Sequence, residues 1–439
     1  MARQMKDSGI EWIGEIPVDW SMKRVKHIFT RKNEKVMQEN PTILSLARDG
    51  VKVRDISNNE GQIAESYYNY NPVEKGDLLL NPMDLYSGAN CSISKVQGVI
   101  SPAYINLRAN AGINPTFYDY YFKVQYWLMV FFSYGKGVSY DNRWTLSAET
   151  LMNYPAVALS YEEQCKRANY LDRKCRQIDA IIARQQEAIE KLKAYKLSVI
   201  SEAVTKGLDP NVPMKDSGVE WIGKIPEHWE FRKIKNCCDV VDCKNRTPEI
   251  IPDGDYIVVR TTCIKDGMFS YNGSYRTDRK NFEEWTAKGQ PQYGDIFFTR
   301  EAPMGEACLV PNEDNLCMGQ RVMFFRPIHG EDPRFILYSI YGPLAREYIE
   351  SKNKGSTVGH LKLGQVASLP LLYCAPEEQK KIANYLDEKC KAINELISCK
   401  QEVVGKLQQY KKSLIYEIVT GKKEVYSANG AGKKAESSS

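Results

Sequence analysis

The sequence has few of the features that mark membrane, metal-binding or secreted proteins. Its longest apolar run, residues 126–132, falls far short of the roughly 20 residues that cross a bilayer. No charged and then apolar segment opens the chain, so we expect a cytoplasmic protein with no membrane partner. Only 4 histidines are present, and the 12 cysteines form no Cys-x-x-Cys pair. We therefore expect no metal site, and we interpret the cysteines as reduced and mostly buried.

Motifs for catalysis are also weak. Residues 218–224 resemble a phosphate-binding loop, but Ile225 stands where a magnesium-binding Ser or Thr is required. Residues 81–84 lack the second proline and the aromatic ring of a methyltransferase motif. Asp253 and Asp278 could hold Mg²⁺ and orient water, which leaves a sequence-specific nuclease as one alternative. We expect no cofactor and no catalytic residue.

Composition describes a protein with hydrophobic cores and leaves the partner open. Hydrophobic residues make up 43% of the chain and charged residues 26%. The net charge of +5 permits binding to nucleic acid but does not demand it, because acidic residues are nearly as numerous as basic ones.

The chain is a tandem duplication. Residues 5–20 recur as 214–229 with twelve of the sixteen positions identical, and residues 162–205 recur without a gap as 377–420. The stretches between these blocks resemble each other only faintly, so a constant frame holds two divergent inserts. Such an arrangement suggests recognition of a two-part target.

The repeat divides the chain into seven segments. We expect an entry motif (1–20), a first variable region (21–160), a long helix (161–208), a second entry motif (209–229), a second variable region (230–375), a second long helix (376–424) and a disordered tail (425–439).

The two repeated C-terminal blocks have the pattern of long amphipathic helices. Residues 162–206 contain no proline and no glycine, and apolar residues recur there every three to four positions. The second copy has the same stripe, interrupted by Gly405 and ended by Gly421. Two such stripes can bury each other. A second alternative function is therefore that of an assembly scaffold, whose helices join proteins without reading DNA.

The repeated frame resembles the specificity subunit of type I restriction-modification systems over residues 5–424. The resemblance is carried by Lys-Asp-Ser-Gly-Val-Glu-Trp-Ile-Gly at 215–223, before a variable region. It is also carried by Glu-Glu-Gln, Asn-Tyr-Leu-Asp, Tyr-Lys and Val-Thr after each one.

The resemblance implies a fold and a role. The expected fold class is α/β, with two mixed α/β target-recognition domains separated by two long antiparallel coiled-coil helices and an internal pseudo-twofold repeat. Each domain would read one half of a bipartite site in double-stranded DNA. The implied partners are two methyltransferase subunits and the restriction/translocase subunits, so the chain itself would not be an enzyme.

The variable regions read as mixed α/β modules of one fold. Apolar segments at 76–80 and 294–300 both begin with Gly-Asp, and further strands are predicted between Gly, Asn and Pro turns. These further strands are 42–48, 103–107, 256–260 and 321–325.

Polar loops at the strand ends supply the candidate DNA contacts. Arg and Lys suit guanine edges and phosphates, while Asn, Ser and Thr suit several base edges. Two glycine-containing loops, 135–144 and 352–360, allow close backbone approach. For any single residue, a solvated loop is the alternative. The candidates are Arg48, Lys52, Arg54, Lys136, Tyr140, Asn142, Arg143, Arg260, Thr261, Thr262, Lys265, Arg300, Glu301, Lys352, Lys354 and Ser356.

Overall fold

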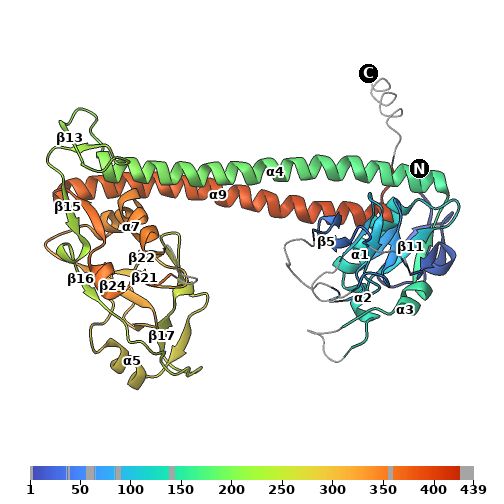
Figure 1. Cartoon of the computed structure of the whole chain (residues 1–439), viewed down its shortest axis with the longest axis horizontal. Coiled ribbons are helices and arrows are strands. Elements are labelled where there is room, and N and C mark those ends of the chain that lie inside the picture. The colour runs from blue at the N-terminus through green and yellow to red at the C-terminus, as the bar shows by residue number, and fades with distance from the viewer. Residues whose placement is uncertain are drawn as a thin grey trace. The chain divides into compact units, whose positions relative to one another are not determined.

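The computed structural model describes residues 3–35, 37, 40–55, 64, 66–83, 85, 90–137, 144–353 and 359–425. The chain forms two compact units (Figure 1): unit 1 comprises residues 1–185 and 402–439, and unit 2 comprises residues 186–401. Of the tail predicted for 425–439, only Val425 is described, and it is buried in the core of unit 1. In the described part of the chain, no helix is both long and apolar enough to cross a membrane.

Unit 1 is built around a four-stranded antiparallel sheet with the strand order β4-β11-β8-β9. Its elements are β1 (Met5–Asp7), β2 (Glu15–Pro17), β3 (Ser21–Arg24), η1 (Val25–His27), β4 (Phe29–Lys32), β5 (Leu44–Ala47), β6 (Gly50–Val53), β7 (Asn71–Val73), β8 (Leu78–Leu80), β9 (Cys91–Ile93), β10 (Gly98–Ile100), β11 (Ile105–Ala109), α1 (Pro115–Trp127), α2 (Val130–Ser133), α3 (Ala148–Asn153), β12 (Pro155–Ala158) and the first part of α4 (Tyr161–Lys206). Strand pairs β1-β2, β3-β12, β5-β6 and β7-β10 complete unit 1, together with the last part of the second long helix, α9 (Pro376–Val419).

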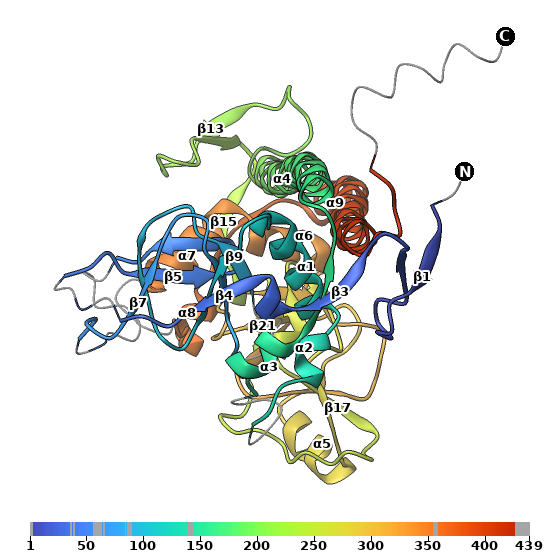
Figure 2. The ribbon, with the colours of Figure 1, turned by 90° about the vertical axis from the view of Figure 1, so that its right-hand side faces the viewer.

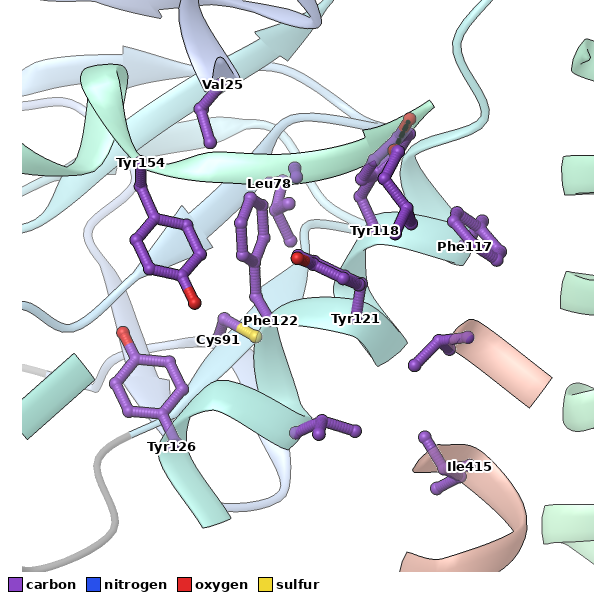
Figure 3. Packing of buried hydrophobic residues seen from close by; sticks show 14 of the residues in the cluster. Val25, Leu78, Cys91, Phe117, Tyr118, Tyr121, Phe122, Tyr126, Tyr154 and Ile415 are labelled. Carbon is purple, nitrogen blue, oxygen red and sulfur yellow. Dashed lines mark hydrogen bonds between the residues drawn. The ribbon is translucent and has the colours of Figure 1, made fainter. Parts of the chain in front are cut away.

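Helix α1 supplies the aromatic centre of the unit 1 core. Phe117, Tyr118, Tyr121 and Phe122 are fully buried, and Figure 3 shows them between the sheet residue Leu78 and the end of the second long helix. The helix starts where it does because the side chain of Asn114 accepts a hydrogen bond from the backbone N–H of the second residue of α1, at 2.9 Å, and a proline follows Asn114.

Unit 2 repeats this plan with the four-stranded order β16-β24-β21-β22. Its elements are β13 (Met214–Asp216), β14 (Lys224–Pro226), β15 (Glu230–Lys233), η3 (Ile234–Asn236), β16 (Cys238–Val241), β17 (Tyr256–Val259), η4 (Thr261–Cys263), β18 (Ile264–Lys265), β19 (Met268–Phe269), β20 (Tyr275–Thr277), α5 (Arg279–Thr286), β21 (Ile296–Thr299), β22 (Ala307–Leu309), β23 (Leu316–Met318), β24 (Val322–Pro327), α6 (Pro333–Tyr341), α7 (Pro343–Asn353), α8 (Leu363–Ala367), β25 (Pro370–Tyr373) and the first part of α9 (Pro376–Val419). A second sheet has the order β20-β17-β23, in which β17 and β23 are parallel. In unit 1, β5 pairs with β6 and is joined next to β10 by a parallel bridge between Ile43 and Val99. The last part of α4 also belongs to unit 2.

The shared Gly-Asp has the same role in both units. The carboxylate of Asp77 accepts a hydrogen bond from the backbone N–H of Glu74 at 2.8 Å, and that of Asp295 accepts one from the N–H of Gln292 at 2.9 Å. Each aspartate is buried and lies beside an arginine of the neighbouring strand. Together with the matching strand order, this confirms the prediction of one fold for both variable regions.

The two predicted amphipathic helices are present as α4 and α9. The predicted end of the second helix at Gly421 is confirmed, and α4 ends in the same way at Gly207, because the two glycines take left-handed φ angles of 79° and 72° that terminate a helix. Within unit 1 the helices run antiparallel, since Arg167 contacts Ile418 while Asp179, further along α4, contacts Lys411. Figure 2 looks toward unit 1 and shows the two helices side by side.

A buried arginine closes the C-terminal end of α9 in unit 1. The Arg167 side chain is fully buried, and its Nη1 donates to the carbonyls of Ile418, at 2.7 Å, and Lys423, at 3.0 Å. The Trp20 ring of the entry motif covers the guanidinium at 4.7 Å. A cation is favourable here because carbonyls at a helix C-terminus lack partners and carry partial negative charge.

Candidate nucleic-acid interface

In unit 2, several loops leave the sheets at a common edge. Registers pair Val241 with Phe324 and Thr299 with Val322, so the loops after β16 and β21 lie beside the start of β24. Strands β17 and β23 are parallel and end together. We call loops 242–247, 260–262, 300–302 and 319–321, together with His360, the unit 2 loop edge.

Hydrogen bonds join these loops into one surface. Thr261 donates from Oγ1 to the carbonyl of Ala302 at 2.9 Å, and the Arg300 N–H donates to the carbonyl of Arg321 at 3.0 Å. The backbone of Leu361 donates to the carbonyl of Arg300 at 3.0 Å. Segments far apart in the sequence, from residue 242 to His360, therefore form a single candidate interface.

Basic side chains on this edge are held in place by an aromatic ring and by acids. The Lys244 Nζ and the Arg246 guanidinium lie 5.0 and 4.9 Å from the centre of the Trp285 ring. Both also pair with Glu284, and the hydrogen bond from Lys244 is the main cause that lowers the pKa of that carboxyl. Because Arg246 remains 65% exposed, it can still meet a phosphate oxygen.

Most predicted contacts of unit 2 are found on or next to this edge. Arg260 and Thr262 are exposed, Thr261 lies between loops, and Lys265 is exposed on β18. The Glu301 carboxylate is already paired, with Arg321 at 3.0 Å and with His360 at 3.2 Å, so it is not free to contact DNA.

Lys352 is exposed in the last turn of α7, where its Nζ lies 5.0 Å from the centre of the Tyr348 ring. None of the described contacts links Lys352 to the loop edge. Lys354 and Ser356 lie outside the described residues.

Arg300 is placed differently from the prediction. Its side chain is only 7% exposed and pairs with Asp242 at 3.2 Å, so its guanidinium is not presented to a ligand. The carboxylate partner comes from a loop 58 residues earlier, which a local sequence pattern does not reveal. Arg300 therefore holds loops together at the edge and does not lie on its surface.

In unit 1 the predicted residues divide between a hairpin and a loop. Arg48 is exposed in the turn between β5 and β6, and Lys52 is exposed on β6, where it pairs with Asp49. Arg54 follows β6 and is half-buried. Lys136 is exposed and forms a two-way backbone bridge with Thr145, at 2.9 and 3.0 Å. Tyr140, Asn142 and Arg143 lie outside the described residues.

The structure adds residues to the candidate interface and gives Asp278 a structural role. Asn245, Gln320 and Arg321 lie on the loop edge, and the polar run that follows Cys243 was a signal that could have pointed to the first of them. Asp278, proposed above as one half of a nuclease pair, caps α5 by accepting from the backbone N–H of Asn281 at 2.8 Å. These hydrogen bonds from Asn281 lower the pKa of Asp278, as is expected for a capping carboxylate.

Comparisons with known proteins agree with the repeated fold. Residues 226–404 match the family model of the type I restriction modification DNA specificity domain. The chain is 22% identical to the type I restriction enzyme MjaVIII specificity subunit of Methanocaldococcus jannaschii, over 94% of this chain and 95% of that protein. The chain is thus similar to type I specificity subunits over most of its length.

Two further likenesses differ in extent. The MjaIX specificity subunit of the same organism is 27% identical over 169 residues, and this alignment covers 38% of each protein. A solved structure described as the "Structural basis underlying complex assembly and conformational transition of the type I R-M system" superposes with a TM-score of 0.67 at 14% identity, covering 92% of this chain and 98% of that one. That likeness supports the predicted mixed α/β fold with its long helices.

Proposed function

We propose that this chain is a specificity subunit that reads a bipartite site in double-stranded DNA, with each variable region reading one half. The observation that carries the proposal is that one scaffold is built twice with different loops. The two four-stranded sheets share their strand order, whereas the loops at the strand ends differ in sequence and in length. A constant frame with two divergent surfaces suits a target made of two unlike parts.

The chemistry of the unit 2 loop edge supports contact with DNA. Arg246 and Arg260 are exposed there, and cations at such positions can bind phosphates or guanine edges. Neighbouring amides and hydroxyls, on Asn245, Thr247 and Gln320, add donors and acceptors suited to base edges. Phosphate contacts would fix the register of this unit, and base contacts would select the sequence.

We further propose that two methyltransferase subunits dock on the long helices and that restriction/translocase subunits join for cleavage. The helices occur twice with near-equivalent sequences, which favours two equivalent docking surfaces. Their solvent-facing sides carry exposed apolar residues, which are Tyr195 and Leu197 on α4 and Leu396 and Tyr410 on α9. The partners would then modify the DNA, and this chain would select the sequence at which they act.

A selection from random double-stranded DNA tests the proposal. The full chain, assembled with its methyltransferase subunits, should enrich sequences with two defined parts separated by a gap of fixed length. Enrichment of one contiguous motif would contradict the two-reader arrangement, and no enrichment would favour an assembly scaffold. Metal-dependent cleavage by the purified chain alone would favour the nuclease alternative.

A further inference from the structure

One buried guanidinium organises the loop that follows β16. Arg300 Nη1 pairs with the Asp242 carboxylate at 3.2 Å, and Nη2 donates to the Cys243 sulfur at 3.7 Å. The same Nη2 donates to Oδ1 of Asn245 at 3.2 Å. Three of the four residues 242–245 therefore contact the buried guanidinium of Arg300.

This contact fixes the orientation of the Asn245 amide. A guanidinium carries only donors, so the group that faces it must be the amide oxygen. Flipping the amide would bring its NH₂ against another donor and leave both without an acceptor. Asn245 itself is exposed, so with Oδ1 directed at Arg300 the NH₂ group is the part of the amide left to meet a ligand.

The backbone around Asn245 is also held in place. Gln320 donates from Nε2 to the Asn245 carbonyl at 3.3 Å, and the backbone N–H of Arg321 donates to the Cys243 sulfur at 3.3 Å. Arg321 has a φ of 73° and Ala302 a φ of 48°, two left-handed non-glycine residues on one edge. Strained backbone of this kind is concentrated at functional sites, where the surrounding structure maintains it.

We propose that Asn245 is a specificity-determining residue that reads a base edge as a donor only, and that Arg300 is the positioning residue that sets this state. The inference rests on the proposed DNA-reading function. Asparagine usually reads adenine by accepting from N6 and donating to N7, and here the oxygen faces Arg300, so only the donor is left to meet a base. Guanine, thymine and adenine each present an acceptor in the major groove whereas cytosine offers only a donor, so Asn245 selects against cytosine.

The test compares base preferences selected by the assembled complex. In wild type, cytosine should be excluded at one position of one half-site. Asn245→Ala should relax that position, with the discrimination between bases falling about 5- to 150-fold, and leave the other positions unchanged. Asn245→Asp, which removes the donors, should lose the same preference.

A double variant tests the role of Arg300. Arg300→Met with Asp242→Asn removes the guanidinium without leaving a carboxylate unpaired. Freed from its donor, Asn245 can turn its oxygen outward and contact both N6 and N7 of adenine, so the preference at the same position should shift towards adenine. A merely structural role would instead weaken binding to all sequences alike. Arg246→Ala, in the same loop, is the matched control: it should lower affinity and leave the preference at the position read by Asn245 unchanged.

The outcomes separate the two proposals. If wild type selects no two-part sequence, the proposed function fails. If wild type does select one, while Asn245→Ala and Asn245→Asp leave every base preference intact, the inference about Asn245 is overturned. Should the double variant not fold, as thermal unfolding would report, the two Asn245 variants still decide the question.

Discussion

The contact between the entry motif and the end of α9 leads to a strong prediction at Gly421. A Cβ atom added there would lie 2.4 Å from Cδ of Pro17, 2.6 Å from Cγ of Pro17 and 3.2 Å from the Trp20 ring. Real Cβ contacts are not that short, so Pro17 and Trp20 would have to move. Trp20 is itself only 1% exposed and covers Arg167, so little free space can absorb the movement.

The expected loss has two parts. An alanine at a φ of 79° costs about 1–2 kcal/mol in backbone strain. Forcing an extra carbon into a filled core costs about 1–3 kcal/mol more. Gly421→Ala should therefore destabilise unit 1 by about 2–5 kcal/mol.

Two matched variants in unit 1 separate the cost of backbone strain from the cost of overpacking. Gly9 has a φ of 69° with nothing within 4 Å of an added Cβ, so Gly9→Ala should cost only the strain. Gly405 lies inside α9, also with open space, so Gly405→Ala should stabilise the helix by about 0.5–1 kcal/mol.

Hydrogen exchange followed peptide by peptide can measure each effect within its own unit. Protection of the α1 peptides should fall in the order Gly405→Ala, wild type, Gly9→Ala, Gly421→Ala. Equal effects of Gly9→Ala and Gly421→Ala would refute the packing of Pro17 against the helix end.

Three further predictions concern DNA reading, pH and spacing. Arg260→Ala should cost about 1–3 kcal/mol and relax one base position if Arg260 meets a base edge, but should weaken all sequences equally if it meets phosphate; binding titrations on single-base variants distinguish the two. Burial raises the pKa of Glu331, so the stability this carboxyl contributes is present below the ordinary pKa of about 4.3 and is lost as pH rises through its folded value. Glu331→Gln should therefore gain stability relative to wild type as the pH rises above about 4.3 in urea unfolding, and a constant difference would show that Glu331 is not the cause. Inserting four residues after Gln185 and four after Lys400 lengthens both helices by about 6 Å, and the gap between selected half-sites should grow by about two base pairs; an unchanged gap with both halves still bound would show that the helices do not set the spacing.

Local sequence patterns predicted the long helices, the strand ends and the common fold of the two variable regions. The long helices follow from apolar residues at helical spacing without proline or glycine, and the strand ends follow from short apolar runs bounded by turns. The repeated Gly-Asp correctly indicated one fold for both variable regions, because each aspartate closes a turn onto its own backbone. These features depend only on residues close together in the chain, so they can be predicted from the sequence.

The interface was predicted less completely, because its contacts join distant segments. Arg300 looked like a surface residue until the fold placed Asp242 beside it. Asp278 looked like a metal ligand, although its carboxylate caps α5. Arg246 was missed because its support, the Trp285 ring, comes from a helix 39 residues later. Which polar residues face inward depends on tertiary partners that no local pattern encodes.

An exchange of one variable region tests the central claim most directly. Residues 230–375 would be replaced by the matching region of another specificity subunit, and methylated sites would be mapped across the genome of cells that carry the complete complex. If each region is an independent reader, one half-site should change while the other half-site and the gap stay the same. A change in both half-sites, or in neither, would contradict the account.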